Sequence, residues 1–157
     1  MPKAYDHPVP ERETRRIDAL QELIIRVHRI GRIVAREAGS TTPAAQWRAL
    51  SALGEIGPMR IGELAAECRV TQPGMTRLVA QLVEHGLVER RHDEADERAV
   101  RVEVTAAGRA ALAAWHATIR EVLAPRFADL SDEEWRAIET ATRLIASRTP
   151  ELIGVER

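Results

Sequence analysis

The stretch IGELAAECRVTQPGMTRLVAQLVEHGLVERRH, residues 61–92, decides the fold. Its first part, residues 61–68, predicts a short helix, and only two residues separate this helix from a second helical pattern. Thr71 belongs to the residue types that cap helix N-termini, and Pro73 suits a first helical turn. A short helix, a tight turn and a capped second helix together indicate a helix-turn-helix.

The second helix of this pair has one apolar face and one polar face. Its apolar residues recur at i, i+3, i+4 and i+7, which is the spacing of a buried helical stripe, and the pattern stops at Gly86. The opposite face carries amide, hydroxyl and guanidinium groups, which read base edges when a helix enters the major groove of DNA. The apolar stripe comprises Met75, Leu78, Val79 and Leu82. The candidate recognition residues are Thr71, Gln72, Pro73, Gly74, Thr76, Arg77 and Gln81.

A charged β-hairpin is predicted directly after this helix. The apolar period drops to two, which indicates strands over residues 87–92 and 98–104, joined by a polar turn. Such a hairpin can act as a wing that reaches the adjacent minor groove or its phosphates. Residues 69–101 hold six arginines and six acidic residues, so only their placement can produce a basic surface, and a merely solvated hairpin is the alternative. The candidate wing residues are Arg90, Arg91, Asp96 and Arg98.

A long first helix is predicted from Glu11 onward. Its apolar residues are spaced alternately three and four apart, and they form a seam wider than one partner helix needs. We therefore expect this helix to contact both its own domain and another chain. Residues 1–10 contain three prolines and are expected to form a flexible arm.

Three further helices have recognisable ends. Their expected bounds are Thr42 to Gly54, Thr105 to Pro125 and Ser131 to Pro150. Each begins with a capping residue type, Pro43 suits a first helical position, and Glu134 completes a capping box with Ser131. The predicted fold class is therefore mostly α with a small β-hairpin wing.

The composition excludes several classes of protein. The 157 residues suffice for one domain with helical extensions, and the net charge of −1 neither indicates nor excludes a polyanionic partner. An aromatic content of 3% disfavours modules that stack single-stranded bases. Cys68 is the only cysteine, and no apolar run approaches the roughly 20 residues of a membrane helix, so we expect a cytoplasmic protein without membrane contact. Motifs of enzymes, and metal-ligand spacings such as H-x-x-H, are missing, so we expect no catalysis, metal or cofactor.

Several short motifs occur together in one order along the chain. They are Leu64-Ala65, the run Val70 to Val79, Leu82, Gly86 to Arg90, Asp96-x-Arg98, Val104-Thr105 and Gly108. As a set, they resemble the multiple antibiotic resistance regulator (MarR) family of bacterial winged-helix transcription factors. The resemblance covers most of the chain. It implies a winged helix-turn-helix DNA-binding lobe in residues 42–105, and an N- and C-terminal helical dimerisation region made of residues 11–41 and 106–157.

The resemblance also implies roles for individual residues. Arg98 is expected to be the wing arginine that enters the minor groove, with Asp96 as the acid that orients it. Two departures from the family pattern are Arg69, where glycine is frequent, and Gly74, where a side chain is commoner. The expected dimer interface includes Ile17, Leu20, Ile24, Trp135, Ile138 and Ile145. The candidate effector crevice comprises His28, Trp47, Trp115 and His116, although plain core packing also explains the two tryptophans.

The expected function is that of a homodimeric, sequence-specific regulator of transcription. It would bind double-stranded DNA at a palindromic operator and act as a repressor that a small effector releases. A winged-helix protein-interaction module, or an antirepressor that does not bind DNA, is the alternative. Salt-dependent binding to duplex DNA distinguishes the two.

Overall fold

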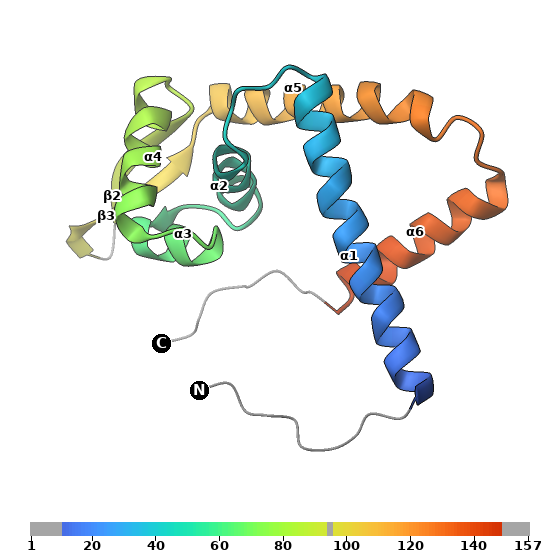
Figure 1. The fold of residues 1–157 in the computed structure, drawn as a ribbon. Coiled ribbons are helices and arrows are strands. Elements are labelled where there is room, and N and C mark those ends of the chain that lie inside the picture. The colour runs from blue at the N-terminus through green and yellow to red at the C-terminus, as the bar shows by residue number, and fades with distance from the viewer. Residues whose placement is uncertain (1–10, 94–95, 149–157) are drawn as a thin grey trace. The chain divides into compact units, whose positions relative to one another are not determined.

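The computed structural model describes residues 11–93 and 96–148 (Figure 1). The chain falls into two compact units, Met1–Ser40 and Thr41–Arg157. The first unit contains one long helix, α1 (Glu11–Glu37), as its apolar seam predicts. The expected arm, residues 1–10, lies outside the described residues. None of the described helices is long and apolar enough to cross a membrane.

The second unit is a helix-turn-helix with a small sheet, followed by two further helices (Figure 1). The three strands are antiparallel and lie in the order β1-β3-β2. The predicted fold class, mostly α with a small β-hairpin wing, is confirmed. The elements are α2 (Ala44–Glu55), β1 (Met59–Arg60), α3 (Ile61–Glu67), α4 (Gln72–Glu84), β2 (Val88–Asp93), β3 (Asp96–Val104), α5 (Ala106–Leu123), a 3-10 turn (Ala124–Arg126) and α6 (Asp132–Ala146).

The core of this unit is formed by α2, α3, α4 and one face of the sheet. All four residues of the predicted α4 stripe are buried, and they pack with Leu50, Leu53 and Leu64 from the two preceding helices. Val102 and Val104 close the core from β3, with their side chains on the face that the alternating pattern predicts. Because the apolar side of α4 is used in this way, its polar side faces solvent.

The predicted helix starts are confirmed where a hydroxyl caps the helix. The side-chain oxygens of Thr71 and Thr105 accept hydrogen bonds from the backbone N–H three residues later, at 3.2 and 3.0 Å. Ser131 makes the same contact at 3.3 Å, and Glu134 accepts the Ser131 N–H at 2.8 Å in return. The bond from the Ser131 backbone, followed by the one from its hydroxyl, lowers the pKa of the Glu134 carboxyl. These contacts define where α4, α5 and α6 begin.

The prediction for the second helix is wrong by a few residues at its end. Gly54 lies inside α2, and the left-handed backbone conformation falls at Gly57, with φ of 103°. Pro43 occupies the N-cap position rather than the first helical one, which is Ala44. Glycine therefore ends the segment, as expected, but the glycine is the later of the two.

The sheet is larger than the predicted hairpin. Met59 and Arg60 form a third strand that pairs with Val102 and Arg101 of β3, and β3 itself starts at Asp96. The last helix ends at Ala146, whereas Pro150, its expected stop, lies outside the described residues. A two-residue strand is too short to leave a period in the sequence, because only its pairing with β3 defines it.

Gly108 joins the start of α5 to the base of the wing. The Thr105 hydroxyl donates to the carbonyl of Gly86 at 2.7 Å, and the Thr105 N–H donates to the carbonyl of Leu87 at 3.1 Å. These bonds draw the first turn of α5 against the chain that leaves α4. A Cβ added at Gly108 would overlap the carbonyl oxygen of Leu87 and come within 2.8 Å of Val104 Cγ2. Only glycine fits at this position without a shift of the backbone.

Candidate nucleic-acid interface

The polar face of α4 is presented to solvent. Six of the seven predicted recognition residues are exposed, and the seventh, Gly74, is partly buried. On the opposite side, Met75 and Val79 are fully buried at 0% exposure, so the core fixes the rotation of the helix about its axis. The structure therefore brings the predicted recognition residues together on one surface, with the N-terminus of α4 at one end.

The side chains of Arg77 and Thr76 contact backbone carbonyls one turn earlier in α4. The Thr76 hydroxyl donates to the carbonyl of Gln72 at 2.9 Å, and Arg77 Nε lies 3.5 Å from the carbonyl of Pro73. The longer contact is weak, because a strong N–H···O bond has a heavy-atom distance of about 2.9 Å. The Arg77 guanidinium can therefore turn toward an external acceptor with little loss of internal bonding.

Gly74 has a local role beside the helix cap. A Cβ at this position would lie 3.0 Å from Thr71 Oγ1, the oxygen that accepts the Gly74 N–H. The absence of a side chain thus leaves space for the cap that starts α4. In the sequence, Gly74 stands out only as a departure from the family pattern, and the structure adds this local reason for glycine.

The wing carries a charged cluster on one face. Glu89 lies opposite Glu103, and Arg91 lies opposite Arg101, in the register of β2 against β3. Arg91 contacts both glutamates, with Nη2 2.6 Å from Glu89 and Nε 3.2 Å from Glu103, and the bond to Glu89 is the larger cause of its raised pKa. Arg101 donates to the carbonyl of Pro58 at 3.1 Å. Exposed ion pairs contribute little to stability, so Arg91 can exchange its carboxylates for phosphate at small cost.

Of the remaining wing residues, the structure describes the side chain of Arg90 but not those of Asp96 and Arg98. Arg90 and His92, two residues apart on β2, are both exposed. Asp96 and Arg98 belong to the β3 backbone, but their side chains lie outside the described residues. The predicted pairing of these two side chains therefore stays a prediction.

Two helices expose apolar side chains. On α1, the predicted interface residues Ile17, Leu20 and Ile24 are 57%, 44% and 51% exposed. On α6, Trp135, Ile138 and Ile145 are 43%, 42% and 40% exposed. Exposed apolar faces of this kind are typical of surfaces that contact another molecule, so the two faces stay candidates for the predicted interface.

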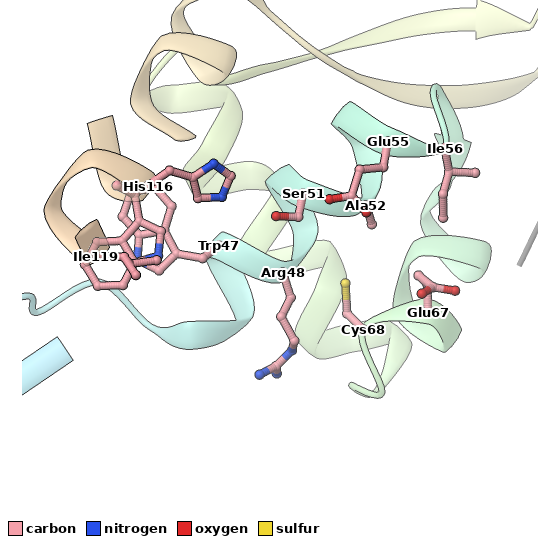
Figure 2. Close-up of a pocket in the computed structure, with 11 residues that line it drawn as sticks. Trp47, Arg48, Ser51, Ala52, Glu55, Ile56, Glu67, Cys68, His116 and Ile119 are labelled. Atoms are coloured by element: carbon pink, nitrogen blue, oxygen red, sulfur yellow. The ribbon is translucent and has the colours of Figure 1, made fainter. Parts of the chain in front are cut away.

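A pocket of about 400 Å³ opens on the second unit between α2, the end of α3 and α5 (Figure 2). The structure brings three of the four predicted crevice residues to it, namely Trp47, Trp115 and His116. The sequence did not indicate that the charged residues Arg48 and Glu67, together with Cys68, also line the pocket. These residues come from two helices that lack a shared motif, so no spacing in the sequence reports their proximity.

Trp47 and Trp115 form one wall of this pocket. Their rings are parallel within 3°, and the ring centroids are 5.0 Å apart. The indole N–H of Trp47 is buried without a hydrogen-bond partner, and it is the one such side-chain polar atom among the described residues. A buried donor without a partner is unfavourable by about 1 to 3 kcal/mol, so the packing of this pair leaves one polar group unsatisfied. Both the core role and the ligand role of the two tryptophans are compatible with this arrangement.

The fourth predicted crevice residue is not among those that line this pocket. His28 belongs to α1, in the first unit, where its Nδ1 donates to the carbonyl of Ile24 at 2.8 Å. No group of three or more histidine, cysteine or acidic residues in the described part of the chain is arranged to hold a metal ion.

Cys68 is expected to react slowly with alkylating agents. Its side chain is 3% exposed, and burial raises the pKa of the thiol, an effect that Arg48 partly offsets and Glu67 increases. Because the thiolate is the reactive form, iodoacetamide at pH 8 should modify the folded protein at least about tenfold more slowly than the urea-unfolded chain. Mass spectrometry of samples quenched over time measures both rates, with Cys68→Ala as the unlabelled control. Equal rates would show that the thiol is accessible. The raised pKa also means that this group favours folding below its unfolded pKa and loses that contribution as the pH rises through the folded value.

The fold and the exposed α4 define a winged helix-turn-helix protein. The model of the MarR family matches residues 40–99. An uncharacterised HTH-type transcriptional regulator of Mycobacterium bovis is 33% identical over 131 residues, which are 83% of this chain and 92% of that protein. The chain therefore belongs to the MarR family of DNA-binding transcriptional regulators.

Solved structures agree with this assignment. A MarR family protein from Bacillus stearothermophilus has a TM-score of 0.69 at 24% identity, and the match covers 90% of this chain and 99% of that one. A probable transcriptional regulator from Pseudomonas aeruginosa has a TM-score of 0.57 at 28% identity, with 82% and 98% covered. The first likeness supports the fold, and the second adds a relative that is described as a regulator.

Proposed function

We propose that this regulator is a homodimeric, non-enzymatic repressor that binds a palindromic operator and is released by a small effector. The observation that carries the proposal is the exposed polar face of α4, which is backed by a buried apolar stripe. The major groove of B-DNA admits one α-helix, so each protomer would read one half-site. The two-fold symmetry of a dimer then requires inverted half-sites about one helical turn apart.

The exposed apolar residues of α1 and α6 support a dimer. Residues 11–41 and 106–157 are proposed to form the dimerisation region, and residues 42–105 the DNA-binding lobe. Water contact with these isoleucines and Trp135 is unfavourable, and a second copy of the chain can remove it. Their burial would also fix the distance between the two α4 helices, and this distance must match the spacing of the two operator half-sites.

The wing is proposed to add contacts beside the major groove. Arg90 and Arg98 would bind phosphate or enter the minor groove, with Asp96 as the orienting acid. Arg91 would join them by leaving Glu89 and Glu103. The glutamates would then face the DNA without their partner, so Arg91 is expected to contribute less than Arg90.

The pocket beside Trp47 and Trp115 is proposed as the effector site. It has charged groups in its lining and a stacked tryptophan pair as one wall, features that fit a planar ligand. The pocket touches α2, α3 and α5, so a ligand can act on the lobe from which α4 projects. Binding would weaken DNA affinity if the ligand prefers a lobe position that mismatches the operator spacing.

The decisive experiment selects binding sites from a pool of randomised DNA duplexes. Repeated capture and sequencing should yield an inverted repeat with half-sites about one helical turn apart. Fluorescence anisotropy with that duplex then measures affinity between 50 and 300 mM salt, where a phosphate-binding protein shows a steep linear decrease in log affinity. If no sequence is enriched and the protein shows no salt-dependent affinity for duplex DNA, a protein-interaction module or antirepressor would be favoured instead.

Arg77→Ala is expected to weaken operator binding by the proposed dimer by about 30-fold to 10⁴-fold. Loss of a base contact costs about 1 to 3 kcal/mol per protomer, and loss of a phosphate contact reduces the salt slope by about 0.9 per protomer. Anisotropy at several salt concentrations tells which of these contacts Arg77 makes. Arg120→Ala, which removes an exposed arginine from α5, is the matched control and should bind like the wild type. Equal affinity of the Arg77 variant and the control would remove Arg77 from the interface.

A further inference from the structure

Three of the described helices end in the same backbone motif. In α1 and α4, the residue after the C-cap is a glycine with positive φ, 59° at Gly39 and 70° at Gly86. At the end of α3 the equivalent residue is Arg69, with φ of 54°. The Arg69 N–H donates to Ala66 at 3.1 Å, and the next N–H donates to Ala65 at 3.0 Å, which completes a Schellman motif.

Arginine is the unfavourable residue type at this position. A Cβ is strained in the left-handed region, whereas glycine adopts it freely and would keep both hydrogen bonds. Within residues 11–93 and 96–148, Arg69 is the one non-glycine residue with positive φ. Strain of this kind concentrates at functional positions, because function can favour a residue that stability does not.

The Arg69 side chain has no folding role that accounts for the strain. It is exposed, and in the described part of the chain it forms no hydrogen bond or ion pair. By contrast, Arg91 and Arg101 are held by partners on the wing. Arg69 stands in the turn of the helix-turn-helix, two residues before Thr71, the residue that caps α4. Its guanidinium is therefore available beside the surface that reads DNA.

We infer that Arg69 contacts a DNA phosphate beside the N-terminal end of α4. This inference rests on the proposed function, because it needs α4 to enter the major groove. A guanidinium fits a phosphate in a forked geometry with two parallel N–H···O bonds. The left-handed backbone conformation of Arg69 fixes the direction in which its side chain leaves the backbone. One such contact per protomer gives two contacts per dimer. The residue improves DNA affinity at the expense of fold stability.

The test compares three variants of the full-length protein. Arg69→Gly removes the guanidinium and the strain, Arg69→Ala removes the guanidinium but keeps a strained Cβ, and Arg120→Ala removes an exposed arginine elsewhere. Thermal unfolding followed by circular dichroism measures the Tm. Anisotropy with a fluorescein-labelled duplex from the selection above measures affinity and its salt dependence. A random 30-base-pair duplex serves as the second probe, because phosphate contacts are also made without sequence recognition.

The two Arg69 variants should share one change and differ in another. Both are expected to lose at least about tenfold in affinity for both duplexes, with the log-log salt slope reduced by about 1.8 for the two lost phosphate contacts of a dimer. Arg69→Gly should also raise the Tm by about 2 °C, whereas Arg69→Ala should leave it nearly unchanged. Arg120→Ala should match the wild type in affinity and slope.

Each other outcome has a defined meaning. If the wild type binds the selected duplex and both Arg69 variants bind with the same affinity and slope, the phosphate contact is refuted while the proposed function stands. If the Tm falls in both variants, Arg69 has a structural role and the inference is also refuted. If the wild type binds neither duplex, the proposed function fails, and the inference fails with it.

Discussion

Gly108→Ala is expected to destabilise the protein by at least about 4 kcal/mol, and so to leave much of the chain unfolded or misfolded. The added methyl would overlap the Leu87 carbonyl oxygen and press on Val104 Cγ2 at 2.8 Å. The obstacle is backbone, which cannot rotate away as a flexible side chain can. Relief would require α5 to move off the base of the wing, and the hydrogen bonds of Thr105 to Gly86 and Leu87 would then be lost.

The matched control is Gly62→Ala in α3. A Cβ at Gly62 meets no atom within 4 Å, and the residue has no positive φ. This variant should keep the stability of the wild type or gain up to about 1 kcal/mol, because alanine is the better helix former. Urea titration of both variants, followed by far-ultraviolet circular dichroism, gives the two free energies of unfolding. A Gly108 variant as stable as the Gly62 variant would show that α5 does not pack against the wing base as described.

Ile138→Asp is expected to convert the proposed dimer to a monomer and to reduce operator affinity by about 10² to 10⁴-fold. Ile138 is 42% exposed in the single chain and belongs to the proposed α6 contact surface. A carboxylate buried there without a partner would oppose association. A monomer retains one α4 helix and loses the gain that comes from holding two half-sites at once.

Thr140→Asp is the control for this substitution. It adds the same charge to α6 at a position that helical geometry places on the other side from Ile138, where Arg143 already donates to the Thr140 hydroxyl at 3.0 Å. Light scattering after size-exclusion chromatography measures the mass of each variant, and anisotropy measures operator binding. A dimeric Ile138 variant with wild-type affinity would remove α6 from the dimer interface.

The sequence predicted the elements that carry a period or a cap. The stripe of α4 was visible because Met75 and Val79 recur at helical spacing, and the starts of α4, α5 and α6 were visible because a hydroxyl residue precedes each helix. The two-residue strand β1 was not visible, since it exists through its partners on β3. The end of α2 was misplaced, because Gly54 and Gly57 are both plausible stops and only the tertiary fold decides between them.

The candidate site was predictable in part for the same reason. A helix face follows from spacing, so the exposed residues of α4 could be named in advance. The pocket combines Cys68 from the end of α3 with His116 from α5, and no local pattern connects these positions. The strain at Arg69 could not be predicted either. The sequence shows only that the residue departs from the family pattern, whereas the φ of 54° shows that its backbone conformation is unfavourable for a residue with a Cβ.

The packing of Gly108 against Leu87 also limits how the protein can move. Residues in the second half of α5 line the pocket, and the first turn of the helix is bonded to the chain between α4 and the wing. One continuous helix joins the pocket to the base of the wing, so a movement of α5 at the pocket would also move the wing base. If a ligand beside Trp115 tilted α5 slightly, α4 and the wing would be displaced together. Contacts with the major groove and with the flanking phosphates would then weaken in a single step.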